Sequence, residues 1–393
     1  MKEGWIYRKL GEVCEIERGG SPRPIDNYIT DDENGINWIK IGDAVEGSKY
    51  ISSTAEKIRP EGMKKSRFVR KGDFILSNSM SFGRPYILGI DGCIHDGWLV
   101  IHDTNNTFNK SYLYYYLSSP ILYAKFKSLA VGGVVNNLNS KLVRGVDVAI
   151  PPISEQQHIV SELDLLSEVI EKQKAQLEEL DKLAQSIFYN MFGDPVTNEK
   201  GWDVKPLKEN VYEMFLGPFG SALKVDSYVQ EEDAYCMVYE QKHAIQATLD
   251  LENHYINKEK FDILSRFEVK PGDFIMSCRG TIGKLYRLPD NAPRGIIHPS
   301  LMKIRIKESA YAPVYFSFML TKIVANETTN GNCVQMAITA KALGNKKIAL
   351  PPLALQQEFA AKVEAIEQMK AKVRQSLKET EELFNSRMDY YFN

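Results

Sequence analysis

The chain has 393 residues, 44% of them hydrophobic and 25% charged, with a formal net charge of −2. This composition is typical of a soluble globular protein and leaves room for two or three domains, each with its own core. Five scattered cysteines without a Cys-x-x-Cys pair argue against a disulfide framework or a zinc site. We find neither the apolar run of a signal peptide nor the ~18 apolar residues of a membrane span, and we expect a cytoplasmic protein.

Residues 1–150 predict a mixed, β-rich domain with a few helices. "KGDFILS", from Lys71 to Ser77, has the pattern of a turn that enters a buried strand. "YLYYYLSSPILYAKFKSL", from Tyr112 to Leu129, has the apolar spacing of a helix.

A long spacer helix is expected next, over residues 151–193. "VAIPPISEQQHI" starts it, and a pair of prolines suits the first turn of a helix but not its interior. Gly193 can end the helix, and a length of ~35 residues would correspond to ~50 Å. Its apolar positions alternate in steps of four and three, the pattern of a coiled-coil seam. The seam comprises Ile159, Leu163, Leu166, Ile170, Gln173, Leu177, Leu180, Ala184, Ile187 and Met191.

The second half of the chain repeats this order about 200 residues later. "GWDVKPL" resembles the earlier "GWIYRKL", "PGDFIMS" matches "KGDFILS", and "IALPPLALQQEF" matches "VAIPPISEQQHI". Residues 194–350 therefore predict a second domain of the same fold, with a helix over 312–326, and residues 351–393 predict a second long helix. Its seam is more polar and comprises Phe359, Val363, Ile366, Lys370, Val373, Leu377, Thr380, Phe384 and Arg387. The fold class is α+β, with two similar globular domains separated by long helices.

Charge is partitioned among these segments. Residues 1–150 and 200–350 each carry a net charge of +3, whereas residues 154–192 carry −5 and residues 354–389 carry −1. Mildly basic domains joined by acidic helices favour a DNA reader with a protein-binding spine.

The candidate DNA contacts lie in equivalent loops of the two halves. These loops contain glycine, small polar residues and cations, which can hold a phosphate or read a base edge, although each could also be an ordinary surface turn. The candidates in the first half are Arg18, Ser21, Arg23, Ser77, Asn78, Ser79, Ser81, Arg84, His95, Asn136, Asn137 and Lys141. Those in the second half are Ser221, Lys224, Arg279, Thr281, Lys284, His298, Gln335 and Lys341.

One alternative to a DNA-binding protein is an enzyme with a catalytic motif of its own. "GTIGKL" lacks the spacing and the Ser/Thr of a phosphate loop, and neither Pro-Pro pair has the context of an adenine methyltransferase loop. Strings of the nuclease type can be drawn from Asp233, Glu240 and Lys242, or from Asp262, Glu268 and Lys270, but neither recurs in the first half. A self-contained restriction or modification enzyme and a coiled-coil scaffold without DNA remain the alternatives.

The two "PPxxxQQ" segments, the two "GDF" segments and the two "GW…L" starts together resemble the specificity (HsdS) subunits of Type I restriction-modification systems. The resemblance spans the whole chain. It implies two target recognition domains, each reading one half of a bipartite, asymmetric DNA site, and two spacer helices that pack antiparallel. It also implies no catalytic residue, metal or cofactor in this chain.

The resemblance further implies the partners. They are double-stranded DNA, two modification subunits that bind S-adenosylmethionine and methylate adenine, and restriction subunits that use ATP and Mg.

Overall fold

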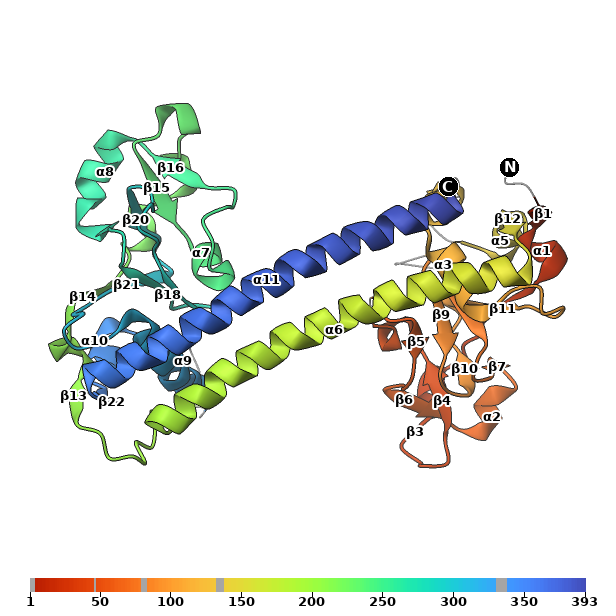
Figure 1. The fold of residues 1–393 in the computed structure, drawn as a ribbon, viewed down its shortest axis with the longest axis horizontal. Helices are drawn as coiled ribbons and strands as arrows, with labels where there is room; N and C mark the ends of the chain where they lie inside the picture. Colours follow the sequence, from red (N-terminus) through yellow and green to blue (C-terminus); the bar gives the residue numbers. More distant parts are fainter. Residues whose placement is uncertain (1–3, 46, 79–82, 132–137, 330–337) are drawn as a thin grey trace. The chain divides into compact units, whose positions relative to one another are not determined.

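The structure, a computed structural model, describes residues 4–45, 47–78, 83–131, 138–329 and 338–393. It divides into two compact units. Unit 1 comprises Met1–Lys174 with Gln375–Asn393, and unit 2 comprises Ala175–Arg374. Each unit contains a β-rich domain and part of both long helices, so the expected α+β class with two similar domains is confirmed (Figure 1).

In the described part of unit 1, the strands form three sheets with the orders β1-β12, β3-β6-β4-β10-β7 and β2-β11-β8-β9-β5. The strands are β1 (Ile6–Lys9), β2 (Glu15–Arg18), β3 (Ile29–Thr30), β4 (Ile36–Ile39), β5 (Tyr50–Ile51), β6 (Glu56–Ile58), β7 (Arg67–Val69), β8 (Phe74–Ser77), β9 (Pro85–Leu88), β10 (Gly92–Ile94), β11 (Trp98–His102) and β12 (Asp147–Ile150).

Unit 2 repeats this plan with the orders β13-β22, β16-β15-β20-β17 and β14-β21-β18-β19. The strands are β13 (Val204–Pro206), β14 (Val211–Leu216), β15 (Cys236–Tyr239), β16 (His254–Ile256), β17 (Glu268–Val269), β18 (Phe274–Ser277), β19 (Leu285–Arg287), β20 (Gly295–Ile297), β21 (Leu301–Ile306) and β22 (Lys347–Ala349). The strand pairings correspond: Trp98 lies opposite Ser77 in one unit, and Leu301 lies opposite Ser277 in the other.

The α-helices are α1 (Leu10–Val13), α2 (Pro60–Met63), α3 (Lys110–Ser118), α4 (Pro120–Val131), α5 (Ser140–Arg144), α6 (Ile153–Phe192), α7 (Gln241–Gln246), α8 (Lys258–Leu264), α9 (Pro313–Thr329), α10 (Ala340–Gly344) and α11 (Leu353–Phe392). The expected helix over 112–129 is interrupted at Ser119, whose extended backbone precedes Pro120. This is the conformation that a proline imposes on the residue before it. Among the described residues, every helix is too short or too polar to cross a membrane.

The long helices α6 and α11 have 40 residues each, about 60 Å by helical rise and longer than the sequence indicated (Figure 1). Gly193 follows α6 at a φ of +74°, and its N–H donates to the carbonyl of Tyr189 at 2.8 Å. A left-handed glycine of this kind ends the helix as expected. The Trp202 indole N–H donates to the carbonyl of Phe192 at 2.9 Å, which satisfies one of the carbonyls left open at this helix end.

A buried glutamine explains the repeated "PPxxxQQ" segments. Gln156 is completely buried, and its Nε2 donates to the carbonyls of Pro151 and Thr107, while its Oε1 accepts from the Asn109 N–H at 2.7 Å. Gln356 makes the same three bonds in unit 2, to Pro351, Ala310 and Ala312. Each glutamine thus ties the start of a long helix to the loop before α3 or α9. We call this arrangement the glutamine brace.

In unit 1, the first half of α6 packs against the last part of α11. Gln173 Nε2 donates to Ser376 Oγ at 2.8 Å, and Arg387 forms an ion pair with Glu162 at 2.7 Å. Ile159 and Leu163 are fully buried, within the core cluster of the domain. The N-terminal half of α6 therefore meets the C-terminal part of α11, which is an antiparallel pairing.

In unit 2, the end of α6 packs against the start of α11 in the same antiparallel sense. The rings of Phe188 and Phe359 lie 5.5 Å apart, edge to face. Lys370, a polar residue of the second seam, forms ion pairs with Asp181 and Glu367, both at 2.7 Å. The polar seam position is thus matched by carboxylates on both helices. The remaining seam positions are buried or half-buried, among them Leu166, Ile170, Leu177, Leu180, Val363, Ile366, Val373, Leu377 and Phe384.

Candidate nucleic-acid interface

Two equivalent hairpins carry the "GDF" segments, β8–β9 in unit 1 and β18–β19 in unit 2. The carboxylate of Asp73 accepts from the Arg70 N–H at 2.8 Å, and that of Asp273 accepts from the Lys270 N–H at the same distance. The aspartate therefore closes the turn that leads into the strand in both units.

The loops at the far ends of these hairpins also correspond. The Ser77 hydroxyl accepts from the Arg84 N–H at 3.0 Å, and the Ser277 hydroxyl accepts from the Lys284 N–H at 2.9 Å. Ser77 is 1% exposed, so its side chain serves the turn rather than the surface. Arg84 is half-buried, whereas Lys284 is exposed.

Asp96 gathers five of the predicted contact residues of unit 1. Its backbone carbonyl accepts from Arg18 Nε and Asn78 Nδ2, both at 3.0 Å. Its carboxylate Oδ1 accepts from the Ser21 hydroxyl at 2.9 Å and lies 3.0 Å from His95 Nε2. Its Oδ2 lies 3.6 Å from Arg23. His95 Nδ1 accepts from the Gly97 N–H at 2.9 Å, so the Nε2 proton points at the carboxylate. We call this set the Asp96 cluster.

The electrostatics of the Asp96 cluster favour the ionised carboxylate. Partial burial alone would raise the pKa of Asp96, but the Ser21 hydroxyl and the charges of His95, Arg18 and Arg23 together lower it below its ordinary value. Arg23 is 81% exposed, so its guanidinium remains accessible for a phosphate or a base edge.

The equivalent corner of unit 2 has a histidine without that aspartate. His298 Nδ1 contacts the Ser300 hydroxyl at 2.8 Å, and burial lowers the pKa of His298. Pro299 occupies the place of Asp96.

Both histidines lie under a glycine loop. A Cβ on Gly19 would lie 2.2 Å from the carbonyl oxygen of His95, and one on Gly217 would lie 2.3 Å from that of His298. Only glycine permits this approach of two backbones. The loops that carry Arg23, and Ser221 with Lys224, are thereby held against the histidine in each unit.

The other predicted contacts are distributed as follows. Exposed side chains in unit 2 are Ser221, Lys224, Arg279, Thr281, Lys284 and Lys341. Lys141 is exposed on α5, in the place that Lys341 takes on α10. Asn78 is buried, and its Oδ1 lacks a partner among the described residues. Ser79, Ser81, Asn136, Asn137 and Gln335 lie outside the described residues.

Acidic residues of both nuclease-type strings contact neighbouring basic side chains. Glu240 contacts Lys242 and His254, both at 2.9 Å, and Asp262 contacts Lys258 at 2.9 Å. In the described part of the chain, the His, Cys, Asp and Glu side chains form no group that could hold a metal ion.

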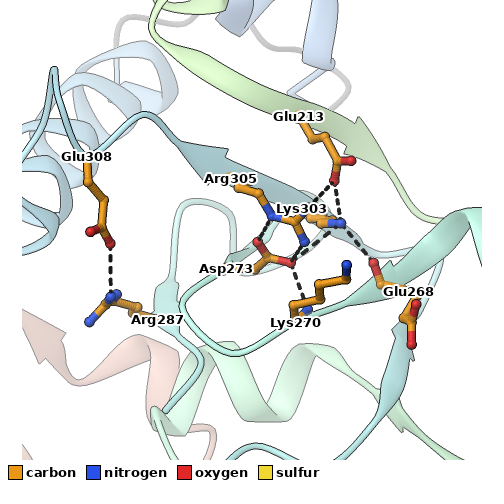
Figure 2. A network of polar contacts seen from close by, with 8 residues as sticks. All are labelled: Glu213, Glu268, Lys270, Asp273, Arg287, Lys303, Arg305 and Glu308. Atoms are coloured by element: carbon orange, nitrogen blue, oxygen red, sulfur yellow. Dashed lines mark hydrogen bonds and ion pairs between the residues drawn. The ribbon is translucent and has the colours of Figure 1, made fainter. Parts of the chain in front are cut away.

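Figure 2 shows a network of charges in unit 2 around Asp273, in the turn that leads into β18. Arg305 donates to both carboxylate oxygens of Asp273 at 2.6 and 2.8 Å. Lys303, which is 3% exposed, contacts Glu213 at 2.5 Å and donates to the Glu268 carbonyl at 2.8 Å. Lys303 lowers the pKa of Glu213, and Asp273 raises that of Arg305. Positive and negative groups alternate, so the network is internally neutralised.

Residues 2–182 match the family model of the Type I restriction modification DNA specificity domain. This match covers just under half of the chain, and the relatives that align over most of the chain are also type I specificity subunits. It is 24% identical to the putative type I restriction enzyme MjaX specificity subunit of Methanocaldococcus jannaschii, over 94% of this chain and 88% of that one. It is 19% identical to the EcoKI specificity subunit of Escherichia coli K12, over 93% and 82%. A 26% match to the MjaIX specificity subunit of Methanocaldococcus jannaschii spans 58% of this chain and 53% of that subunit.

Solved structures show the same fold. A chain from a study of complex assembly and conformational transition of the type I R-M system aligns with a TM-score of 0.65 at 19% identity, over 100% of this chain and 98% of that one. The S subunit of a Type-I restriction-modification system from M. genitalium aligns with a TM-score of 0.53 at 13% identity, over 98% and 95%.

Three polar features escaped the sequence reasoning. Asp96 was missed because Pro299 takes its place, so the repeat does not point to it. Gln156 and Gln356 were visible as a repeat but had no assigned role. Lys40 was missed, and Glu240 was considered only as part of a nuclease-type string. The two residues lie 200 positions apart with opposite charges, so a comparison of charge between the two halves would have found them.

Proposed function

We propose that this protein is the non-catalytic DNA-recognition subunit of a type I restriction-modification complex. Each domain reads one half of a bipartite, asymmetric site. The observation that carries this proposal is the repetition, in both units, of a glycine loop held against a histidine beside exposed cations. Two copies of one reading site suit a target with two separate parts.

The proposed contacts are the accessible members of the candidate set. Guanidinium and ammonium groups can hold phosphates or donate to guanine, while hydroxyls can contact either strand. They are Arg18, Arg23, Lys141, Ser221, Lys224, Arg279, Thr281, Lys284 and Lys341.

The partners follow from the same proposal. α6 and α11 would dock two modification subunits, which supply S-adenosylmethionine and the adenine methyltransferase activity. Restriction subunits would supply ATP hydrolysis with Mg. The chain itself would bind no cofactor.

The direct test is a methylome. The chain is co-expressed with the adenine methyltransferase encoded beside it, and modified adenines are located by long-read sequencing. We expect one split motif, with a methylated adenine in each half and a fixed gap. A stable complex that methylates an unsplit motif, or none, would favour the enzyme or scaffold alternatives.

The long helices are proposed to set the gap. Deleting one heptad from α6 and the facing heptad from α11 removes about 10 Å of helix, or about three base pairs of DNA rise. The gap in the methylated motif should shrink, while both half-site sequences stay the same. A deletion variant that methylates the original spacing would refute this ruler.

A further inference from the structure

Lys40 in unit 1 and Glu240 in unit 2 occupy equivalent positions but carry opposite charges, and each contacts a side chain of the neighbouring strand. Lys40 Nζ lies 2.5 Å from Glu56 in unit 1, and Glu240 lies 2.9 Å from His254 in unit 2. The strand pairings establish the equivalence, because Trp38 lies opposite Glu56 and Val238 lies opposite His254.

Both positions lie next to the histidine that the glycine loop covers, which is His95 in unit 1 and His298 in unit 2. The His95 N–H donates to the carbonyl of Ile39 at 3.0 Å, and the His298 N–H donates to that of Tyr239 at 2.8 Å. Lys40 and Glu240 are therefore the first residues after the strands that hold His95 and His298.

At both positions the backbone N–H donates to a side chain three residues later in the chain. The Lys40 N–H donates to Asp43 Oδ2 at 2.7 Å, and the Glu240 N–H donates to His243 Nδ1 at 2.8 Å. Each is the residue before a short helical turn. The two positions therefore share their backbone setting but carry side chains of opposite charge.

The Glu240 side chain is positioned by its neighbours. Lys242 and His254 both contact its Oε2, and the ring of Tyr228 stacks on His254 at 4.6 Å with an interplanar angle of 3°. Burial alone would raise the pKa of Glu240, yet its hydrogen bonds and electrostatic contacts with Lys242 and His254 lower it. A carboxylate offers about four acceptor positions, so further donors can still be bound.

The same corner is joined to a candidate contact loop. Gln241 Nε2 donates to the carbonyls of Arg279 and Thr281, at 2.6 and 3.4 Å. The exposed side chains of Arg279 and Thr281 are thus carried by a loop that is anchored next to Glu240.

We infer that Lys40 and Glu240 determine the base read at one position of each half-site. An ammonium can only donate, so Lys40 selects guanine, whose major-groove edge presents two acceptors. An ionised carboxylate can only accept, so Glu240 selects cytosine through its amino group. This inference rests on the proposed function and deepens it.

The test compares methylomes of the chain co-expressed with its methyltransferase, as wild type and as Glu240→Gln. Glutamine keeps the shape but both donates and accepts, a pattern that suits adenine. We expect one position of the second half-site to change from cytosine toward adenine, with discrimination against other bases reduced about tenfold, the size of one base contact. The first half-site should be unchanged.

Two further variants support this comparison. Lys40→Gln should relax one guanine position of the first half-site only. Glu308→Gln is the matched control, because Glu308 is an ion-paired carboxylate of unit 2, with Arg287 at 3.3 Å, and is 67% exposed. Its methylome should equal that of the wild type.

A folding defect is handled by a second variant. If Glu240→Gln does not co-purify with the methyltransferase, Glu240→Asp keeps the charge and withdraws it by one methylene. It should lower methylation of cytosine-containing sites about tenfold in the second half-site context. A split wild-type motif that stays unchanged in the folded Glu240 variant overturns this inference alone. A wild type without a split motif overturns it together with the proposed function.

Discussion

The β8–β9 and β18–β19 hairpins share one backbone plan but differ in the charges around their first aspartate. In unit 1, Asp73 is paired with His102 at 3.5 Å, and its side chain is 24% exposed. In unit 2, Asp273 is 1% exposed and binds Arg305 through two bonds. The strand register places His102 and Arg305 at equivalent positions after Ile101 and Ile304.

The difference shows which parts of the repeat are constrained. In both units the aspartate accepts from the N–H of a turn residue, and in both the glutamine brace ties a long helix to its domain. These interactions satisfy buried backbone groups, which every copy of the fold must do. The partner of the aspartate across the sheet differs between the units, since it is His102 in unit 1 and Arg305 in unit 2.

The largest expected effect is loss of the shared glutamine brace. Gln156→Ala or Gln356→Ala removes three hydrogen bonds at a fully buried site and leaves backbone groups unsatisfied. We expect the free energy of unfolding of the affected unit to fall by about 3 kcal/mol. Hydrogen exchange of the two units, followed by mass spectrometry, measures this loss separately in each.

The neighbouring glutamines provide the control for the brace. Gln157 and Gln357 are exposed, so the same substitution there should change stability by less than about 0.5 kcal/mol. Equal effects at Gln156 and Gln157 would show that the buried bonds are not what holds the helix start.

The next effect separates the two hairpins. Asp273→Asn leaves Arg305 and the buried Lys303 with one carboxylate fewer, and we expect a loss of about 3 kcal/mol in unit 2. Asp73→Asn is the matched change in unit 1, where the pair is more exposed and longer, and it should cost about 1 kcal/mol or less. Urea titrations with exchange as the readout compare the two; a larger loss in unit 1 would reverse our ranking.

The smallest effect is a pH dependence confined to unit 1. The hydrogen bond with Asp73 raises the pKa of His102, even though burial opposes it. A raised pKa in the folded state means that the stabilisation is complete below the ordinary histidine pKa of about 6.5 and is lost as pH rises through the folded value. At most about 1 kcal/mol should be lost from unit 1, because the pair is partly exposed.

Unit 2 supplies the internal reference for this pH effect. Asp273 raises the already high pKa of Arg305, so the guanidinium keeps its charge over the same range. Exchange rates corrected for intrinsic pH dependence should therefore show loss of protection in β8 but not in β18. At acidic pH the stability of unit 1 depends on Asp73. Burial alone would raise the pKa of Asp73, but the hydrogen bond from His102 lowers it. The stabilisation by Asp73 is therefore lost only as pH falls through this lowered pKa.

The sequence by itself predicted the repeat, the two long helices and the heptad seam, because these depend on local periodicity and on proline and glycine signals. It also indicated the loops near His95 and His298. It erred at Ser119, where the residue before Pro120 leaves the helical conformation. The helix lengths were underestimated by about five residues, since a helix end also depends on packing and capping.

Only the tertiary structure decided which distant polar side chains contact one another. Asp96 gathers residues from the 18–23 stretch, Asn78 and its neighbour His95. Gln156 reaches back to a loop 47 residues earlier, and Lys303 is buried beside Glu213 from a strand 90 residues away. Such contacts have no period along the chain, because they depend on which strands become neighbours in a sheet. Local sequence therefore specifies the elements of this protein, whereas strand pairing specifies its polar sites.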